Sequence, residues 1–238
     1  MKRRNAFLTA EWRNILMFNY AVDPGLLGRF VPAGTELDVF EGKTWLSLVA
    51  FEFRLARVLG FRIPFHQAFE EVNLRFYVRR ARKRGVVFIR ELVPKYAVAA
   101  VARLAFGENY SRTRMSHRVQ TGSGGYVAAE YSFGAGRNRC RMELETEGPG
   151  LPAGQGSFEQ FITEHYWGYV AQRGGCCLEY EVRHPPWRVW HAGRASFSGS
   201  TVGIYGPEVS QVLMRVPECA FLCEGSSVEV FKGVEVCS

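Results

Sequence analysis

The sequence predicts an α+β fold dominated by antiparallel β-strands, with a few helices packed outside them. Short segments rich in β-branched and aromatic residues recur along the chain, about ten of them against three helical patterns. Turns rich in glycine, proline and asparagine separate them, which favours antiparallel sheets that are closed or stacked. The chain has 238 residues, 47% of them hydrophobic and 22% charged, enough for a sizeable core. We therefore expect one domain over residues 1–238.

The first part of the chain is expected to alternate strands with short turns. Residues 11–22 form the first predicted strand, and Asp23 caps a short helix that follows it. Residues 37–40 and 44–54 are expected to pair as a hairpin. The next segment, residues 58–69, is too apolar for an ordinary solvent-exposed loop, so we expect it to line or cover something.

Residues 71–79 alternate in polarity with the two-residue period of a strand. One face is apolar and carries Val72, Leu74, Phe76 and Val78. The other face carries Glu71, Asn73, Arg75, Tyr77 and Arg79. This second face is expected either to meet solvent or to form the wall of a polar cavity. The basic turn at residues 79–84 either contacts a phosphate backbone or, as is more usual, stays solvated at a hairpin tip.

Residues 86–93 predict a strand, and Pro94 then begins an alanine-rich helix expected over residues 95–106. Lys95 lies where the strand becomes the helix. Apolar neighbours and the positive end of the helix dipole would both lower the pKa of its ammonium group. A neutral lysine amine can form a Schiff base with a carbonyl compound. The alternative is that Lys95 extends to solvent with its stem lying on the helix.

The remaining chain is expected to consist mostly of strands. They are predicted at residues 112–118, 126–134, 138–145, 178–183 and 187–192, with one or two more within 220–236. Residues 149–156 have the composition of a linker. Ser157 and Gln160 form a capping box for a helix expected over residues 158–173. His165 lies on the apolar stripe of that helix, where a structural histidine is commoner than a catalytic one.

The net charge and the cysteine spacing indicate which partners and which redox state to expect. A formal net charge of +7 would suit a nucleic acid or an anionic substrate, although arginine richness alone also produces it. The six cysteines show no C-x-x-C spacing and no histidine at zinc-finger spacing, so we expect six reduced thiols in a cytoplasmic protein. No run approaches the ~20 apolar residues of a membrane span.

Common motifs for phosphate, dinucleotide, hydrolase and zinc sites are absent, so we expect neither a metal nor a cofactor. What remains is a set of polar side chains on otherwise apolar segments. This set is Glu70, Glu71, Arg75, Tyr77, Arg90, Glu91, Lys95, Tyr110 and His165, and all of them except Glu70 are the candidate site residues. Arg90 and Glu91 face opposite sides of a strand unless a bulge intervenes. A buried glutamate would need a partner or a raised pKa, and an ion pair between strands is the structural alternative.

Seven phrases of the chain carry a family resemblance. They are FLTAEWRN (residues 7–14), VPAGTE (31–36), FHQAFEEVNLRFYVR (65–79), GVVFIRELVP (85–94), ENY (108–110), FITEHYWGY (161–169) and HPPWRVW (184–190). Together they resemble the YqjF-like family of uncharacterised bacterial proteins, which is grouped with the acetoacetate decarboxylase-like fold. This resemblance covers nearly the whole chain. It implies a cone or barrel of antiparallel strands with helices outside and a cavity within.

The same resemblance implies a candidate chemistry. Acetoacetate decarboxylase forms a Schiff base with its substrate through a lysine. The residues that resemble a shortened form of its active stretch are Arg90, Glu91, Pro94 and Lys95. Lys95 would stand for the Schiff-base lysine, whereas Tyr96 stands where that stretch has a second lysine. The resemblance therefore implies the fold more strongly than the activity.

Three functional hypotheses follow. The first is a protein that binds a small organic acid, or acts on it without Schiff-base chemistry, through Arg75, Tyr77, Arg90, Tyr110 and His165. The second, ranked slightly lower, is a decarboxylase-type lyase in which Lys95 forms the Schiff base and Glu71 or Glu91 is the acid or base. The third, ranked well below, is nucleic-acid binding through residues 79–84. No membrane partner is expected, and the sequence leaves homo-oligomerisation open.

Overall fold

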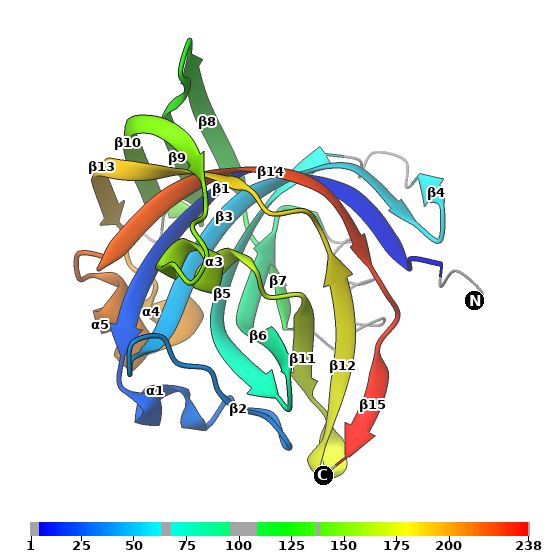
Figure 1. Ribbon diagram of the computed structural model, residues 1–238. Coiled ribbons are helices and arrows are strands. Elements are labelled where there is room, and N and C mark those ends of the chain that lie inside the picture. The colour runs from blue at the N-terminus through cyan, green and yellow to red at the C-terminus, as the bar shows by residue number, and fades with distance from the viewer. Residues whose placement is uncertain (1–4, 63–67, 96–108, 137–138, 238) are drawn as a thin grey trace.

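The computed structural model describes residues 5–62, 68–95, 109–136 and 139–237, and β-strands dominate it (Figure 1). Within this part of the chain the strands join into one 15-stranded sheet. Most neighbouring strands are antiparallel, and two neighbouring pairs are parallel. The prediction of a β-dominated α+β fold is confirmed, with a mixed sheet in place of a purely antiparallel one.

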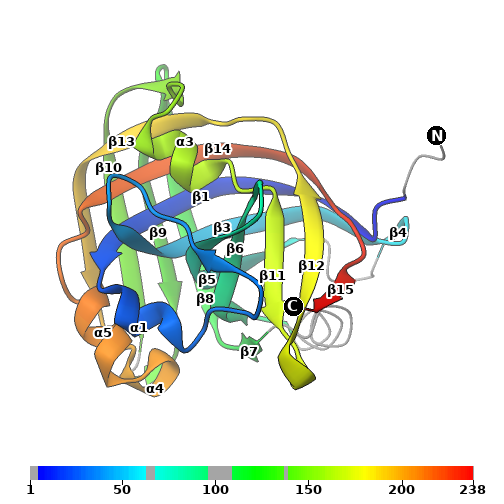
Figure 2. The same cartoon turned by 60° about the horizontal axis from the view of Figure 1, so that its bottom comes forward.

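Seven strands form a ring that is closed by a short contact (Figure 2). In their order around the ring they are β12 (Cys176–Arg183), β11 (Trp167–Ala171), β6 (Lys83–Val93), β5 (Ala68–Arg80), β3 (Thr44–Val58), β1 (Leu8–Val22) and β14 (Cys219–Val230). β12 meets β14 through two residue pairs, Val182 with Val230 and Arg183 with Glu229. Because this closing contact is so short, the ring is not a clean barrel.

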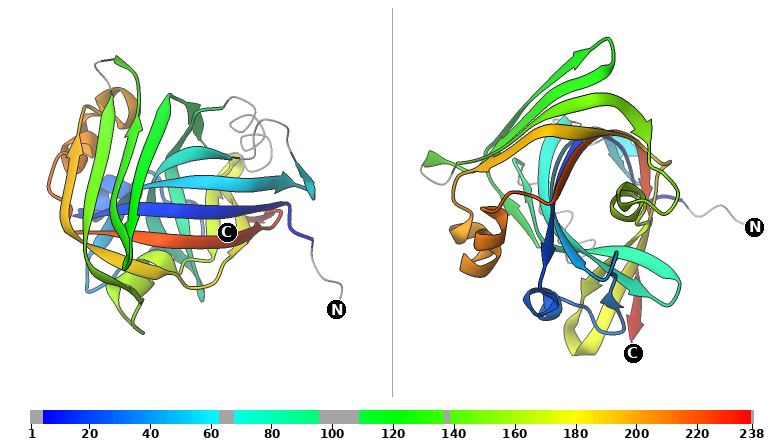
Figure 3. Two further views of the ribbon diagram at one scale, coloured as in Figure 1. Left: turned by 90° about the horizontal axis from the view of Figure 1, so that it is seen from above. Right: turned by 60° about the vertical axis from the view of Figure 1, so that its left-hand side comes forward.

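Four further strands extend the sheet beyond β14 and fold back over the outside of the ring (Figure 3). They are β13 (Arg188–Ser198), β10 (Cys140–Pro152), β9 (Gly125–Phe133) and β8 (Met115–Gly122). Tyr131 of β9 and Met142 of β10 share one buried cluster with Leu74 of β5. This first cluster, the outer cluster, buries outer-facing residues of the ring strands beneath the extension. The inner faces of the ring strands enclose a second apolar cluster, the inner cluster, which includes Phe51, Phe69 and Trp187.

Short elements complete the fold. They are the strands β2 (Glu36–Leu37), β4 (Phe61–Arg62), β7 (Tyr110–Arg112) and β15 (Val234–Cys237), the helices α1 (Pro24–Gly28), α3 (Phe158–Thr163), α4 (Val202–Tyr205) and α5 (Pro207–Leu213), and the turn η2 (Arg173–Gly175). Helices α1, α4 and α5 lie together at one end of the sheet, whereas α3 packs Phe161 and Ile162 into the inner cluster (Figures 2 and 3). None of the described helices is both long enough and apolar enough to span a membrane.

The predicted helix over residues 158–173 is wrong beyond its first turns. Ser157 does cap α3, since its hydroxyl accepts a hydrogen bond from the backbone N–H of Gln160, but the helix ends at Thr163. The chain then extends into β11, which pairs with β6 on one side and with β12 on the other. This sheet pairing outweighs the helical periodicity of the segment. His165 consequently lies in the connection between α3 and β11.

Two more expectations are corrected by strand pairing. The predicted hairpin of residues 37–40 and 44–54 is present only at its turn, where Phe40 and Lys43 form an antiparallel bridge. β2 pairs with β5 and not with β3, because β5 already occupies that edge of β3 from Leu46 to Arg54. Residues 149–152 of the predicted linker belong to β10, where Leu151 and Pro152 pair with β13. Apart from Lys95, the predicted helix over residues 95–106 lies outside the described residues, as does the middle of the loop 58–69.

The expectation of six reduced thiols is wrong for one pair of cysteines. Cys176 and Cys237 form a disulfide, because the adjacent strands β12 and β15 place them directly opposite each other. The four cysteines outside this disulfide are Cys140, Cys177, Cys219 and Cys223. The disulfide therefore fixes the last strand to the edge of the ring.

Loss of this disulfide is expected to lower the free energy of unfolding by about 2–4 kcal/mol, since a link across 61 residues restricts the unfolded chain. Denaturant unfolding of the oxidised protein and of the Cys176→Ser/Cys237→Ser double variant measures the difference. Cys140→Ser is the control for replacing a sulfur atom, because Cys140 lies outside the disulfide. Equal stability of the oxidised protein and the double variant would contradict the prediction.

Candidate functional site

The polar face of β5 forms one wall of a cavity inside the ring. The outer-facing residues of β5 are Val72, Leu74, Phe76 and Val78. Glu71, Asn73 and Arg75 alternate with them and line the cavity. Of the two environments that the sequence allows for this polar face, the structure has the cavity wall. Because the strand is covered on both sides, these polar groups are held away from bulk water.

The cavity has a volume of about 140 Å³. Much of its wall is aromatic, with Trp12, Phe51, Phe53, Phe69 and Trp187. An engineered cavity of about 150 Å³ holds benzene, so this one suits a molecule of about six non-hydrogen atoms. Apolar walls with a few polar groups are typical of small-molecule sites.

Glu71 is a buried carboxyl group in this wall. It is 3% exposed, the amide of Asn73 donates to Oε1 over 3.2 Å, and the hydroxyl of Tyr110 donates to Oε2 over 3.3 Å. Burial raises the pKa of Glu71 to about 7, although both hydrogen bonds and the charge of Arg75 act in the opposite direction. The carboxyl group therefore exchanges its proton near neutral pH, as a general acid or base does.

A second buried carboxyl group, Glu91, lies on β6 directly across from Asn73 and also lines the cavity. Its neighbour Arg90 faces the other side of the sheet. There its charge acts on Tyr205 of the outer cluster. Burial raises the pKa of Tyr205, and the charge of Arg90 opposes this only in part. The two residues therefore lie on opposite faces, as strand alternation requires.

Arg75 brings a positive charge to the cavity. Its Nη2 donates to the backbone oxygen of Ile162 over 3.3 Å and lies 3.9 Å from Sδ of Met17. The ion pairs found among the described residues do not include Arg75, and its buried Nε has no hydrogen-bond partner there. Since a guanidinium matches a carboxylate in plane and spacing, Arg75 is suited to bind an organic anion.

His165 is oriented by an acidic partner. Its Nε2 lies 3.3 Å from Oδ2 of Asp38, and Nε of Arg84 donates to the same oxygen over 2.6 Å. Burial lowers the pKa of His165 to about 4, so the ring is neutral at neutral pH. Burial acts to raise the pKa of Asp38, but the hydrogen bonds from His165 and Arg84 outweigh it and lower that pKa. Because a carboxylate only accepts, Nε2 carries the proton and Nδ1 is a hydrogen-bond acceptor.

A second neutral histidine, His184, lines another part of the wall. Its Nδ1 lies 2.9 Å from the backbone oxygen of Pro185, and its ring stacks on Trp187 with 4.2 Å between centroids. Burial lowers the pKa of His184 to about 4. Because the carbonyl only accepts, Nδ1 carries the proton, and Nε2 is left as an acceptor.

Four buried polar atoms of cavity-lining residues have no hydrogen-bond partner within the described part of the chain. They are Nε1 of Trp12, Oδ1 of Asn73, Nε of Arg75 and Nδ1 of His165. Two are donors and two are acceptors. Buried polar atoms in folded proteins nearly always have partners. The wall is therefore complementary to a ligand that both donates and accepts hydrogen bonds.

The structure brings most of the predicted site residues together. Those that line the cavity are Glu71, Arg75, Glu91, Tyr110 and His165. Tyr77 is not among the residues that line the cavity. Its hydroxyl lies 2.7 Å from Oγ of Ser47, and its ring centroid lies 4.7 Å from that of His165. Tyr77 is thus placed to support His165.

Lys95 does not join this group. It is half-buried just beyond the end of β6 and is not among the residues that line the cavity. Its charge acts instead on Glu70, whose pKa is lowered first by a hydrogen bond with His117 and least by Lys95. Glu70 precedes Glu71 on β5 and so faces the opposite side of the sheet. Lys95 therefore lies near a carboxyl group outside the cavity.

Sequence reasoning missed several residues of the site. Asn73 was within reach, because the alternation that selects Glu71 and Arg75 also selects Asn73. Trp12 and His184 lie within the phrases that carry the family resemblance, but no spacing marks them as cavity residues. Asp38 is 127 positions from His165, and no local signal predicts that contact.

The basic turn between β5 and β6 is paired with carboxylates. The ion pairs are Arg79 with Glu36 at 2.9 Å, Arg80 with Glu179 at 3.7 Å, Lys83 with Glu179, and Arg84 with Asp38 at 2.6 Å. Such pairing partly neutralises the charge that would attract a phosphate backbone.

Sequence comparison matches the chain to known proteins over most of its length. The family model of DUF2071, described as an uncharacterized conserved protein, matches residues 9–226. The uncharacterized protein YqjF of Bacillus subtilis (strain 168) is 29% identical over 213 residues, which are 85% of this chain and 84% of YqjF.

Structural comparison finds the same fold in solved proteins. Acetoacetate decarboxylase from Legionella pneumophila matches with a TM-score of 0.70 at 11% identity, over 100% of this chain and 90% of that chain. The enduracididine biosynthesis enzyme MppR matches with a TM-score of 0.68 at 11% identity, over 97% and 88% of the two chains. An acetoacetate decarboxylase-like enzyme from Sphingomonas wittichii RW1 gives 0.67 at 12% identity, over 98% and 94%. At these identities the likeness shows the fold alone.

Proposed function

This chain belongs to the DUF2071 family of uncharacterized conserved proteins, and from that premise we propose that its cavity binds a small organic acid non-covalently. The observation that carries the proposal is Arg75, a cation in a largely apolar cavity that makes no ion pair among the described residues. Its charge acts on Glu71, but with a pKa of about 7 that carboxyl group is partly protonated at neutral pH. A cation in such a place is stabilised by an anionic partner. The carboxylate of the ligand supplies that partner.

The remaining polar groups give the ligand a second recognition element. With a pKa of about 7, Glu71 is partly protonated at neutral pH and can donate a hydrogen bond to a carbonyl oxygen. Nδ1 of His165 accepts a hydrogen bond from a hydroxyl or enol group. Together with the volume of about 140 Å³, these groups favour short oxo or hydroxy acids. One solved structure of MppR is described as complexed with pyruvate, which has this size and charge.

Two alternatives are ranked lower. A Schiff-base lyase that uses Lys95 requires its amine to reach a bound carbonyl carbon, and the position of Lys95 outside the cavity wall favours non-covalent binding. Nucleic-acid binding through residues 79–84 is disfavoured by the carboxylate partners of those side chains.

Isothermal titration calorimetry with pyruvate and acetoacetate tests the proposal. We expect saturable binding, and acetone, which lacks the carboxylate, is expected to bind at least about tenfold more weakly, since a hydrogen bond to a charged group is worth about 1.5–3 kcal/mol. Borohydride added to the complex is expected to leave the protein mass unchanged. No binding of either acid would contradict the proposal. A mass increase that disappears in Lys95→Arg would establish the Schiff-base alternative instead.

A further inference from the structure

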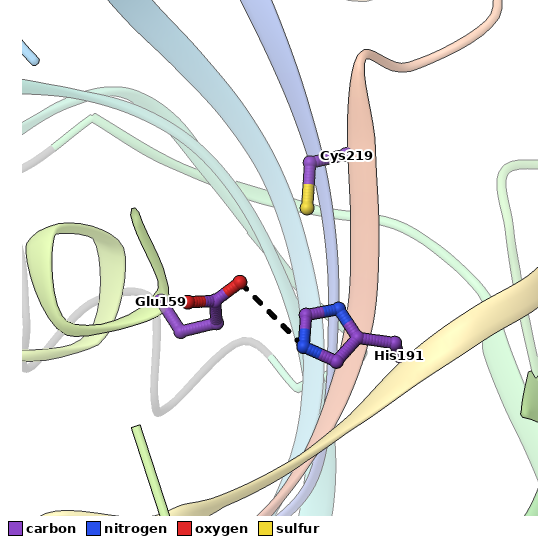
Figure 4. A group of neighbouring side chains, drawn as sticks. All are labelled: Glu159, His191 and Cys219. Carbon is purple, nitrogen blue, oxygen red and sulfur yellow. Dashed lines mark ion pairs between the residues drawn. The ribbon is translucent and has the colours of Figure 1, made fainter. Parts of the chain in front are cut away.

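Three side chains of metal-ligand type, from distant parts of the chain, meet beside α3 (Figure 4). Glu159 lies in the first turn of α3, His191 on β13 and Cys219 at the start of β14. One carboxylate oxygen, one imidazole nitrogen and the sulfur all lie within 4.8 Å of one another. Figure 4 shows the three side chains converging from three elements. None of the three is among the residues that line the cavity, so this cluster is a separate feature.

We propose that Glu159, His191 and Cys219 bind one zinc ion, with a water molecule as the fourth ligand. Thiolate, imidazole and carboxylate are the three protein ligand types that zinc uses, and they form its tetrahedral sites. A calcium or magnesium site would be built from oxygen atoms, so the sulfur and nitrogen select a softer ion. Three protein ligands with an open fourth position are the arrangement of zinc sites that retain a water.

The distances fit a tetrahedral ion. With a zinc–sulfur bond of about 2.3 Å and zinc–nitrogen and zinc–oxygen bonds of about 2.0 Å, ligand atoms stand roughly 3.3–3.5 Å apart. Nε2 of His191 and Oε1 of Glu159 are 3.5 Å apart, longer than an ordinary hydrogen bond and suitable for a bridging ion. The upper limit of 4.8 Å within the cluster requires only small side-chain rotations.

Access and charge also suit a divalent cation. The side chain of His191 is 54% exposed, so an ion can enter from solvent, whereas that of Glu159 is 19% exposed and less free to move. Zinc binding releases the proton of a thiol ligand, so Cys219 would bind the ion as the thiolate. Thiolate and carboxylate together then balance the charge of the ion.

The structural consequence concerns α3. This helix has six residues, too few to be stable by itself, and its residues Ile162 and Thr163 line the cavity. An ion held by Glu159 would fasten the first turn of α3 to β13 and β14. The site would therefore stabilise one wall of the cavity without contacting a ligand there.

Cobalt(II) titration of the metal-stripped protein tests the proposal, because cobalt replaces zinc and reports thiolate coordination by absorption. We expect one equivalent to bind, with a near-ultraviolet sulfur-to-cobalt band and the intense visible bands of four-coordinate cobalt, and zinc to displace it. The titration is done under argon without a reductant. A second set of ligand-type side chains, Cys176, Glu235 and Cys237, is then inactive, because its sulfurs are held in the disulfide.

Variants assign the site. Cys219→Ser is expected to abolish the sulfur-to-cobalt band, and His191→Gln, an exposed substitution, to weaken cobalt binding by about 100-fold. Cys140→Ser is the matched control and should bind as the unmodified protein does, since Cys140 lies outside both the disulfide and the cluster. Circular dichroism confirms that each variant folds. A titration without the band, or a band that survives in Cys219→Ser, would overturn the proposal.

Discussion

Arg75→Gln is expected to weaken pyruvate binding by about 30-fold or more. Removing one partner of a desolvated charge pair costs about 2–5 kcal/mol, because the other charge is left buried without a partner. Here the carboxylate of the ligand would meet the mostly apolar wall of a cavity of about 140 Å³ with no cation in its place. Calorimetry at constant pH and salt concentration measures the change.

Arg79→Gln is the matched control for this substitution. Arg79 lies on the same strand, β5, but its charge is paired with Glu36 outside the cavity. Its substitution should leave pyruvate affinity within about twofold, since exposed ion pairs contribute little. Arg75→Lys is expected to bind with intermediate affinity, because lysine keeps the charge and loses the planar pair of donors. If Arg75→Gln and Arg79→Gln bind pyruvate equally well, the ligand does not sit on Arg75.

The sequence predicts those site residues that follow from the two-residue alternation of a single strand. β5 is covered on both faces, yet its inner face carries Glu71, Asn73 and Arg75, so the two-residue alternation of polarity survives in the sequence. The same reasoning separates Glu91 from Arg90, which the structure places on opposite faces.

The parts that the sequence does not predict depend on contacts between distant segments. The hydrogen bond that orients His165 comes from Asp38, 127 positions away, and the two-pair contact between β12 and β14 has no sequence signal. Residues 164–171 have helical periodicity but extend into β11, because β11 forms backbone hydrogen bonds with both β6 and β12. Strand pairing therefore explains why the predicted helix over residues 158–173 ends early, and why His165 lies in a connection and not on a helix.

The pH dependence of stability should isolate Glu71. Its pKa is about 7 in the folded protein and 4.5 in its ordinary state, so between these values the folded state binds more protons than the unfolded state. The contribution of Glu71 is therefore full below pH 4.5 and is lost as pH rises through 7, by on the order of 3 kcal/mol. Glu71→Gln removes this term. Compared with the unmodified protein, Glu71→Gln is expected to be similarly stable near pH 4.5 and more stable near pH 8.

Denaturant unfolding of both proteins between pH 4.5 and pH 8 gives the measurement. Two histidines change the stability with pH in the opposite direction, but they are present in both proteins, so their contributions cancel in the comparison. His165 and His184 have folded pKa values of about 4 against 6.5, so their contributions are present above pH 6.5 and are lost as pH falls toward 4. Glu70 is the matched control. A hydrogen bond with His117 lowers its pKa, so its contribution to stability changes with pH in the opposite direction to that of Glu71. The bond with Glu70 also raises the pKa of His117, so the two groups are both charged near pH 6. Glu70→Gln should thus be less stable than the unmodified protein near pH 6, with the deficit shrinking as pH falls. A stability difference between Glu71→Gln and the unmodified protein that does not change with pH would show that Glu71 titrates normally, and would remove the proton exchange on which its proposed role depends.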